Sequence, residues 1–204
     1  MRRYDEVMFT DAVKTLQEAD GSADMYERSY GARTHALTAD EVAFVTSRTS
    51  FYMATVSETG WPYIQHRGGP AGFLKVLDDH TLGFADYRGN RQHISEGNLA
   101  GDNRVSLFLM DYPRKARMKL QGRATFQAAA EANDLATRLA VEGQGRVERV
   151  VTIALEAFDW NCPQFITPRF DASEIAQLVG PEMDKQAARI AALEAELAAL
   201  KGQG

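Results

Sequence analysis

Residues 51–66 read Phe51-Tyr52-Met53-Ala54-Thr55-Val56-Ser57-Glu58-Thr59-Gly60-Trp61-Pro62-Tyr63-Ile64-Gln65-His66, a pattern typical of a β-hairpin. Aromatic and β-branched residues fill both arms, and the polar turn Glu58-Thr59-Gly60 separates them. A second hairpin is predicted over residues 73–85, with its turn at Asp78-Asp79. Consecutive hairpins indicate an antiparallel sheet.

Further apolar runs predict additional strands of this sheet, and other segments of the sequence predict helices beside it. The additional strands are predicted over residues 105–110, 117–126 and 147–155. The helices are predicted over residues 38–47, from about 89 to 97, and over 128–141. The first of these helices begins with a capping box, Thr38 as N-cap and Glu41 three residues later. The pattern predicts a mainly β fold in which five or six antiparallel strands close into a barrel with flanking helices.

The chain divides into three predicted segments. Residues 1–37 form a helical arm, residues 38–170 a barrel domain, and residues 171–204 a long amphipathic helix. In that last helix, Met183, Ile190 and Leu197 are spaced by seven, as are Leu193 and Leu200. Two interpretations stay open: a short parallel coiled coil with Arg189–Glu194′ and Glu196–Lys201′ pairs, or a helix docked on its own or a partner's barrel.

Composition excludes several classes of protein. The 204 residues are 45% hydrophobic and 25% charged, which excludes global disorder and low-complexity architectures. The net charge of −5 argues against long polyanions and anionic membranes as partners. No apolar run approaches the about 20 residues of a membrane span, and no secretory signal is present, so a cytoplasmic protein is expected.

The average charge hides a cationic middle. Between Trp61 and Thr125 the chain has ten cations and six anions, whereas the remainder carries −9. Two segments in this region each combine the end of a predicted strand with glycine and arginine: residues 65–75 and residues 84–93. Glycine exposes backbone N–H groups, and a helix start at Asn90 to Gln92 would favour a phosphate. The alternatives are a plain loop for the first segment and a solvated turn for the second.

Other constellations are weaker. The cations between Arg114 and Arg123 suit either an anion or a polar outer strand face. Residues 160–169 could cover a flat ligand or simply connect the barrel to the last helix. The four histidines show no metal spacing and no carboxylate partner, and Cys162 is interpreted as a small buried hydrophobe. Gly-x-Ser-x-Gly, Walker and Gly-x-Gly-x-x-Gly motifs are absent from the sequence.

From about Thr38 to Arg169 the chain resembles the pyridoxamine 5′-phosphate oxidase-like FMN-binding split-barrel family. Residues 67–75, 82–92 and 103–108 and the strand end Gly122-Arg123-Ala124 carry the resemblance. It implies a six-stranded split β-barrel that forms a homodimer, with FMN at the subunit interface.

The resemblance also implies a set of cofactor-binding residues. Arg67 and Lys75 match a strand that presents an arginine and a lysine to FMN, and Asn90 and Arg91 match a phosphate-binding pair. Arg117 falls where the partner subunit contacts the flavin. The complete implied set is Arg67, Gly68, Lys75, Phe84, Ala85, Asp86, Arg88, Asn90, Arg91, Gln92, Arg117, Trp160 and Arg169.

The chain departs from the oxidases of this family in two places. The spacing between Arg67 and Lys75 is longer, and the interval between Trp160 and Arg169 lacks the Arg-x-His that serves the pyridoxal substrate. The resemblance therefore implies an FMN-dependent oxidoreductase that acts on a small substrate other than pyridoxamine phosphate, by hydride transfer at flavin N5. The alternative is a non-catalytic module for a flavin or another flat anion, such as a deazaflavin or haem. No side chain stands out as a general acid or base, and no metal site is expected.

Overall fold

The fold is taken from a computed structural model, which describes residues 1–31, 36–160 and 164–202. The chain forms two compact units. The first comprises residues 1–111 and 116–164, and the second comprises residues 112–115 and 165–204. His35 and Cys162, and the predictions that concern them, lie outside the described residues.

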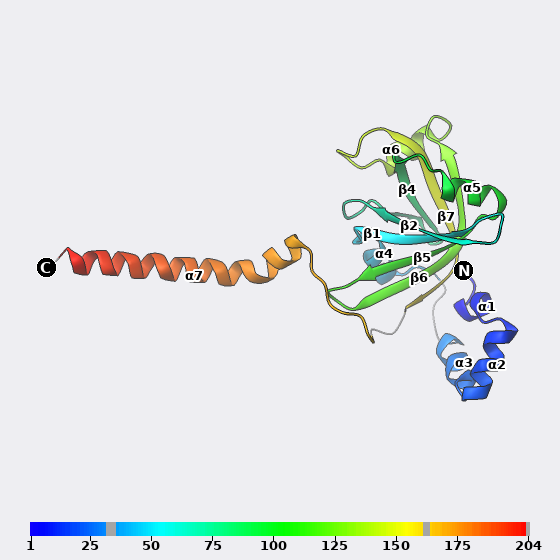
Figure 1. The fold of residues 1–204 in the computed structure, drawn as a ribbon, viewed down its shortest axis with the longest axis horizontal. Helices are drawn as coiled ribbons and strands as arrows, with labels where there is room; N and C mark the ends of the chain where they lie inside the picture. Colours follow the sequence, from blue (N-terminus) through cyan, green and yellow to red (C-terminus); the bar gives the residue numbers. More distant parts are fainter. Residues whose placement is uncertain (32–35, 161–163, 203–204) are drawn as a thin grey trace. The chain divides into compact units, whose positions relative to one another are not determined.

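An antiparallel sheet of seven strands forms the centre of the first unit (Figure 1). Its order is β2-β1-β5-β6-β7-β4-β3. The strands are β1 (Ser50–Val56), β2 (Pro62–Gly68), β3 (Lys75–Asp78), β4 (Thr81–Tyr87), β5 (Arg104–Asp111), β6 (Ala116–Ala128) and β7 (Val147–Trp160). Both predicted hairpins are confirmed, as β1–β2 and β3–β4.

The sheet curls strongly, although the described pairings do not close it. Phe51 on β1 contacts the ring of Phe84 on β4 at 5.5 Å between centroids, although β5, β6 and β7 lie between these strands in the sheet. The closed barrel predicted from the hairpins is therefore wrong in closure, and the predicted count of five or six strands is wrong, whereas the curled antiparallel sheet is consistent with the split barrel that the resemblance implies. The second hairpin contributes a separate four-residue edge strand, β3, which among the described strands pairs with β4 alone.

Apolar side chains from the concave side of the sheet fill the space inside this curl. Alternation along β5 and β6 places every second residue there, so the strands bury one face each. The fully buried side chains include Phe51, Met53, Leu82, Leu107, Leu109, Met118, Leu120 and Ile153. The predicted mainly β fold is confirmed, and the curl brings β2 close to β4.

Helices flank the sheet, and their starts follow local capping. They are α1 (Tyr4–Met8), α2 (Asp11–Asp20), α3 (Ala23–Gly31), α4 (Ala39–Thr46), α5 (Ile94–Gly101), α6 (Asn133–Leu139) and α7 (Ala172–Lys201). The predicted capping box of α4 is confirmed, because the Thr38 N–H donates to Glu41 Oε2 at 2.9 Å. The helix predicted over 128–141 is shorter, because β6 continues to Ala128 and α6 begins at Asn133.

The N-terminal arm packs on β7 through aromatic residues. The Arg2 N–H donates to the Glu156 carbonyl at 2.7 Å, and Tyr4 is buried in a cluster with Tyr30 and Ala157. This arm belongs to the first unit, whereas α7 belongs to the second. The predicted domain boundaries after residues 37 and 170 stay predictions.

Helix α7 begins as the sequence predicts, with the Asp171 side chain accepting a hydrogen bond from the Glu174 N–H at 2.8 Å.

Among the described residues, no helix is both long and apolar enough to span a bilayer.

Candidate functional site

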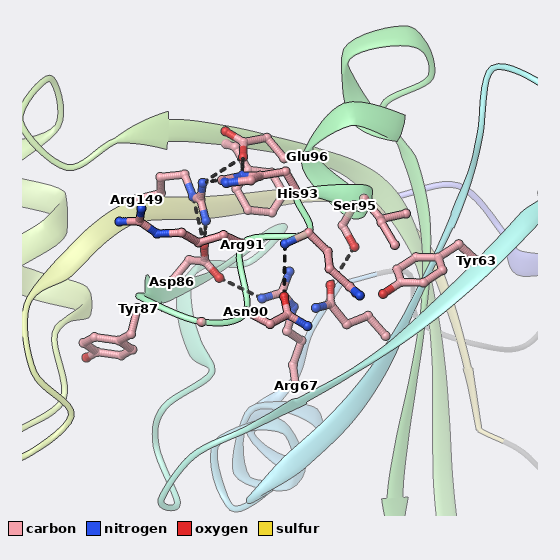
Figure 2. A pocket seen from close by; sticks show the side chains of 15 residues that line it. Tyr63, Arg67, Asp86, Tyr87, Asn90, Arg91, His93, Ser95, Glu96 and Arg149 are labelled. Carbon is pink, nitrogen blue, oxygen red and sulfur yellow. Dashed lines mark hydrogen bonds and ion pairs between the residues drawn. The ribbon is translucent and has the colours of Figure 1, made fainter.

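Two adjoining cavities lie where β2 approaches β4. The first encloses about 250 Å³ between β2, β4, β7 and the segment that enters α5 (Figure 2). The second encloses about 270 Å³ and is lined by the glycine segment after β2 and by the end of β4. Arg67, Asp86 and Tyr87 line both cavities, so the two form one composite site.

A chain of ion pairs crosses this site. Asp86 is 6% exposed, and its Oδ1 accepts a hydrogen bond from Arg67 Nη1 at 2.7 Å. Its Oδ2 accepts from Arg149 Nε at 2.9 Å and from Arg149 Nη2 at 2.6 Å. Arg149 Nη1 in turn donates to Glu96 Oε2 at 2.8 Å. These contacts tie β2, β4, β7 and α5 together around the cavity, as Figure 2 shows.

Arg149 stays protonated in this setting. Burial disfavours its charge, but the hydrogen bonds and charge of Asp86, with the charges of Glu96 and Glu148, outweigh burial and raise its pKa above the usual value. Arg149 therefore keeps its positive charge at any physiological pH.

Arg67 retains one unused donor. Its Nε is buried and has no hydrogen-bond partner among the described residues. Its guanidinium carbon lies 5.6 Å from the centroid of the Phe84 ring. A buried donor without a partner is costly, and Arg67 Nε is one of two such side-chain atoms in the part of the chain that the structure describes.

The segment between β4 and α5 is not helical as predicted. Helix α5 begins at Ile94 rather than among Asn90 to Gln92, because Arg91 and His93 adopt left-handed backbone conformations with φ of 59° and 54°. The Asn90 side chain also accepts a hydrogen bond from the Gln92 N–H at 3.2 Å, which favours a turn. The expected helix N-terminus at Asn90 is therefore replaced by an irregular loop along the cavity wall.

This loop presents Arg91 as a partly available cation. The Arg91 side chain is 57% exposed, and its Nη2 lies 3.8 Å from Glu148 Oε1, too far for a good hydrogen bond. Arg88 is exposed and makes no ion pair with any residue that the structure describes. Arg88 and Arg91 are thus the cations near the cavity that no buried carboxylate neutralises.

Helix α5 is anchored to the sheet by two polar contacts. The Ser95 hydroxyl donates to Gln65 Oε1 at 2.7 Å, and Asn98 Nδ2 donates to the Thr55 hydroxyl at 2.9 Å. Ser95, Asn98 and Thr55 are all buried. These contacts fix the start of α5, and with it the loop that carries Arg91.

Eight of the thirteen residues predicted to bind the cofactor line the composite site. They are Arg67, Gly68, Phe84, Ala85, Asp86, Asn90, Arg91 and Gln92. Asp86 faces arginines rather than open space, because it is the anion that joins Arg67 to Arg149. The cofactor-binding role of all eight stays a prediction.

The remaining five residues have other surroundings. Lys75 Nζ donates to the Arg138 carbonyl at 2.7 Å, and Arg88 is exposed beside the cavities but is not among the residues that line them. Arg117 lies over Phe108, with its guanidinium carbon 6.0 Å from the ring centroid. Trp160 Nε1 donates to Glu41 Oε1 at 2.8 Å. Within the second unit, the Arg169 guanidinium carbon lies 5.1 Å from the centroid of the Tyr112 ring.

Two residues of the ion-pair chain were not anticipated, Arg149 and Glu96. Arg149 pairs directly with Asp86 across β4 and β7, a partnership of residues 63 positions apart that depends on the strand register. His93 Nδ1 lies 2.7 Å from Glu96 Oε2, which corrects the expectation that no histidine has a carboxylate partner. The spacing of three residues between His93 and Glu96 was the signal available in the sequence.

The site offers proton-transfer and anion-binding groups but no metal cluster. Within residues 1–31, 36–160 and 164–202, no group of three His, Cys, Asp or Glu side chains is arranged to hold a metal ion. The first cavity has three arginines, two carboxylates and one histidine on its wall. This arrangement suits a ligand with an anionic end, and the second cavity adds the aromatic walls Phe73 and Phe84.

Comparison with known proteins places most of this fold in one family. The family model described as pyridoxamine 5′-phosphate oxidase matches residues 37–155, more than half of the chain. No curated protein matches. HupZ from Group A Streptococcus is similar in structure, with a TM-score of 0.51 and 18% identity over 66% of this chain and 99% of that one.

Two further solved structures show weaker similarity. A candidate pyridoxamine 5′-phosphate oxidase from Lactobacillus delbrueckii has a TM-score of 0.48 and 21% identity over 63% of this chain and 97% of that one. An FAD-binding protein from Mesorhizobium loti has a TM-score of 0.42 and 15% identity over 61% of this chain and 94% of that one.

Proposed function

Because the chain belongs to the pyridoxamine 5′-phosphate oxidase family, we propose that it is a flavoprotein that binds FMN and transfers hydride between the flavin and a small substrate. The composite cavity between β2 and β4 carries this proposal. It lies within the part of the chain that the family model matches, and eight of the residues implied by the resemblance line it.

The residues of the cavity fit the parts of FMN. Each cavity alone is smaller than the about 300–1,000 Å³ typical of small-molecule sites, so FMN would occupy both cavities, on either side of the residues that they share. The phosphate of FMN carries about −1.5 to −2 charges, and Arg91 and Arg88 are the cations available to it. The isoalloxazine ring requires an apolar wall, which Phe73 and Phe84 supply in the second cavity.

When bound, a flavin supplies a hydride acceptor at N5. The chain's own residues then position the bound flavin and polarise its ring. Asp86 holds the Arg67 guanidinium in place on the wall that the two cavities share, where its positive charge can polarise a bound ring. His93 Nδ1 lies 2.7 Å from Glu96 Oε2 and 3.0 Å from Arg149 Nη1, so His93 is held against the ion-pair chain at the wall of the first cavity.

The proposed active form is a homodimer with FMN at the subunit interface, in the cytoplasm. One face of the β1–β2 hairpin exposes Tyr52, Val56 and Ile64, and Trp61, at the end of the turn between the strands, is 75% exposed. Contiguous exposed apolar residues mark association surfaces. The proposed contact of Arg117 with the flavin of the other subunit rests on the resemblance.

The visible spectrum of the purified full chain tests the proposed function. We expect flavin absorption bands, either as isolated or after addition of FMN, and bleaching of those bands by NADPH or NADH under anaerobic conditions. The R88A/R91A variant should lose the bands, whereas R28A, at an exposed site on α3, should keep them. A colourless protein that ignores added FMN would contradict the proposal, and bound flavin that no reductant bleaches would favour a passive binding module. Bands of a deazaflavin or haem instead would identify a different cofactor.

A further inference from the structure

Helix α7 presents an uncovered apolar stripe. It runs without interruption over 30 residues, and none of them is buried. Met183, Ile190, Leu193, Leu197 and Leu200 are between 44% and 69% exposed. Their spacing of three and four places them on one side of the helix, the arrangement of a and d positions in a heptad repeat.

We propose that this stripe pairs with α7 of a second copy of the chain in a parallel two-stranded coiled coil. In this register Met183, Ile190 and Leu197 occupy a positions, and Leu193 and Leu200 occupy d positions. A β-branched residue at a followed by leucine at d, as in Ile190 and Leu193, favours two strands. This inference concerns an interaction surface in the second unit and does not depend on the flavin site.

Charge complementarity selects a second copy as the occupant. Arg189 and Glu196 fall at g positions, and Glu194 and Lys201 at e positions. A parallel partner in register then forms Arg189–Glu194′ and Glu196–Lys201′, each of which occurs twice because the pair is symmetric. In the preceding heptad the pairing is Glu182 with Ala187′, so none of the three g–e′ positions is repulsive.

The helix geometry sets the extent of the coil. Pro181 lies inside α7, removes one backbone hydrogen bond and favours a bend at that point. Residues 182–201 continue beyond it for 20 residues, about 30 Å of helix. Gln186 at a d position weakens one layer. Fewer than three heptads are marginal alone, so the coil is proposed for the full chain, in which the folded units keep the helices at a high local concentration.

Cysteine cross-linking tests the pairing directly. In a parallel coil each residue lies opposite its own copy, so L193C in a C162A background should form an interchain disulfide in most chains under mild oxidation. A195C, at the outward f position two residues away, is the matched control and should stay mostly monomeric on a non-reducing denaturing gel. Equal cross-linking of both variants, or of neither, would overturn the proposal.

Charge reversal tests the register. Within the C162A/L193C background, R189E places like charges at both symmetric g–e′ contacts and should lower the cross-linked fraction several-fold. R189E/E194R restores opposite charges and should restore cross-linking. If R189E has no effect, or if the double variant is not rescued, the parallel register is wrong. None of these cross-linking experiments uses a flavin, so a negative result would not affect the proposed function. Conversely, a protein that does not bind FMN would not affect the proposed coiled coil.

Discussion

Asp86 is the residue on which the geometry of the site most depends. Its carboxylate is almost fully buried and accepts hydrogen bonds from two arginines that come from different strands, β2 and β7. A buried carboxylate of this kind compensates two charges that would otherwise be desolvated without a partner. Asp86 therefore acts as a positioning residue, which fixes where the guanidinium of Arg67 faces the cavity.

Replacement of Asp86 by asparagine should destabilise the protein by about 3 kcal/mol, because it leaves Arg67 and Arg149 without their shared anion. Urea unfolding at pH 7 measures the change. Asp79→Asn, an exposed substitution in the β3–β4 turn, should change the free energy of unfolding by less than about 0.5 kcal/mol. Equal stability of the two variants would show that the ion-pair chain contributes nothing net.

Glu41 makes stability depend on pH in the acid range. Burial raises the pKa of Glu41, but hydrogen bonds from Thr38 and Trp160 lower it by a larger amount. The pKa in the folded protein therefore lies below the usual value. A carboxyl with a depressed pKa contributes stability above its unfolded pKa and loses that contribution as the pH falls through the folded value.

We therefore expect the free energy of unfolding of the wild type to fall from about pH 5 downward, and to fall less in the Glu41→Gln variant. Urea unfolding at several pH values between 7 and 3 gives both slopes. Glu18→Gln, on the exposed side of α2, should keep the wild-type slope. If E41Q and the wild type lose stability equally, Glu41 has no such role.

At the scale of elements, α5 is held to the sheet by buried polar pairs rather than by a broad apolar face. Asn98 and Thr55 form one such pair, and Ser95 and Gln65 form the other. The loop that carries Arg91 enters α5 directly, so these pairs also hold the wall of the cavity.

Asn98→Ala should cost about 1–3 kcal/mol, because it leaves the buried Thr55 hydroxyl without a partner. Thr55→Val alone should also destabilise. The double variant T55V/N98A should cost less than the sum of the two single changes by at least about 0.5 kcal/mol. Thr137→Val on α6 is a distant control that should add to N98A without coupling. Strict additivity of T55V and N98A in urea unfolding would refute the pairing.

The elements also show what the sequence could predict. Local signals located the two hairpins, the capping box of α4 and the start of α7, since each depends on neighbouring residues. The predicted start of α5 was wrong. Left-handed conformations at Arg91 and His93 are unusual for these residue types, and the amino-acid composition of the segment does not indicate them. Arg149 was missed because its pairing with Asp86 depends on the register of β4 and β7, including a bulge after Asp86.

At the scale of the whole molecule, the cationic middle is largely neutralised by the fold. Lys119 pairs with Asp159, and Arg123 pairs with Glu156, so carboxylates of β7 compensate cations of β6. Asp86 compensates Arg67 in the same way. Near the cavity, Arg88 and Arg91 therefore carry the positive charge that no buried carboxylate compensates. Two cations suit one small anion rather than a polyanion.

The full chain should be a dimer at micromolar concentration, because both the exposed apolar face of the β1–β2 hairpin and the heptads of α7 favour a second copy. Multi-angle light scattering should give twice the 22.6 kDa mass of the chain. A mass of one chain would contradict both association surfaces.

The central claim is that the arginines beside the composite cavity hold the phosphate of FMN. The most direct measurement is a pair of fluorescence titrations of the full chain, one with FMN and one with riboflavin, which lacks the phosphate. We expect FMN to bind at least about tenfold more tightly, equivalent to about 1.4 kcal/mol, and we expect R88A/R91A to remove most of that difference. Equal affinity of the wild type for FMN and riboflavin, or no binding of either, would contradict the account.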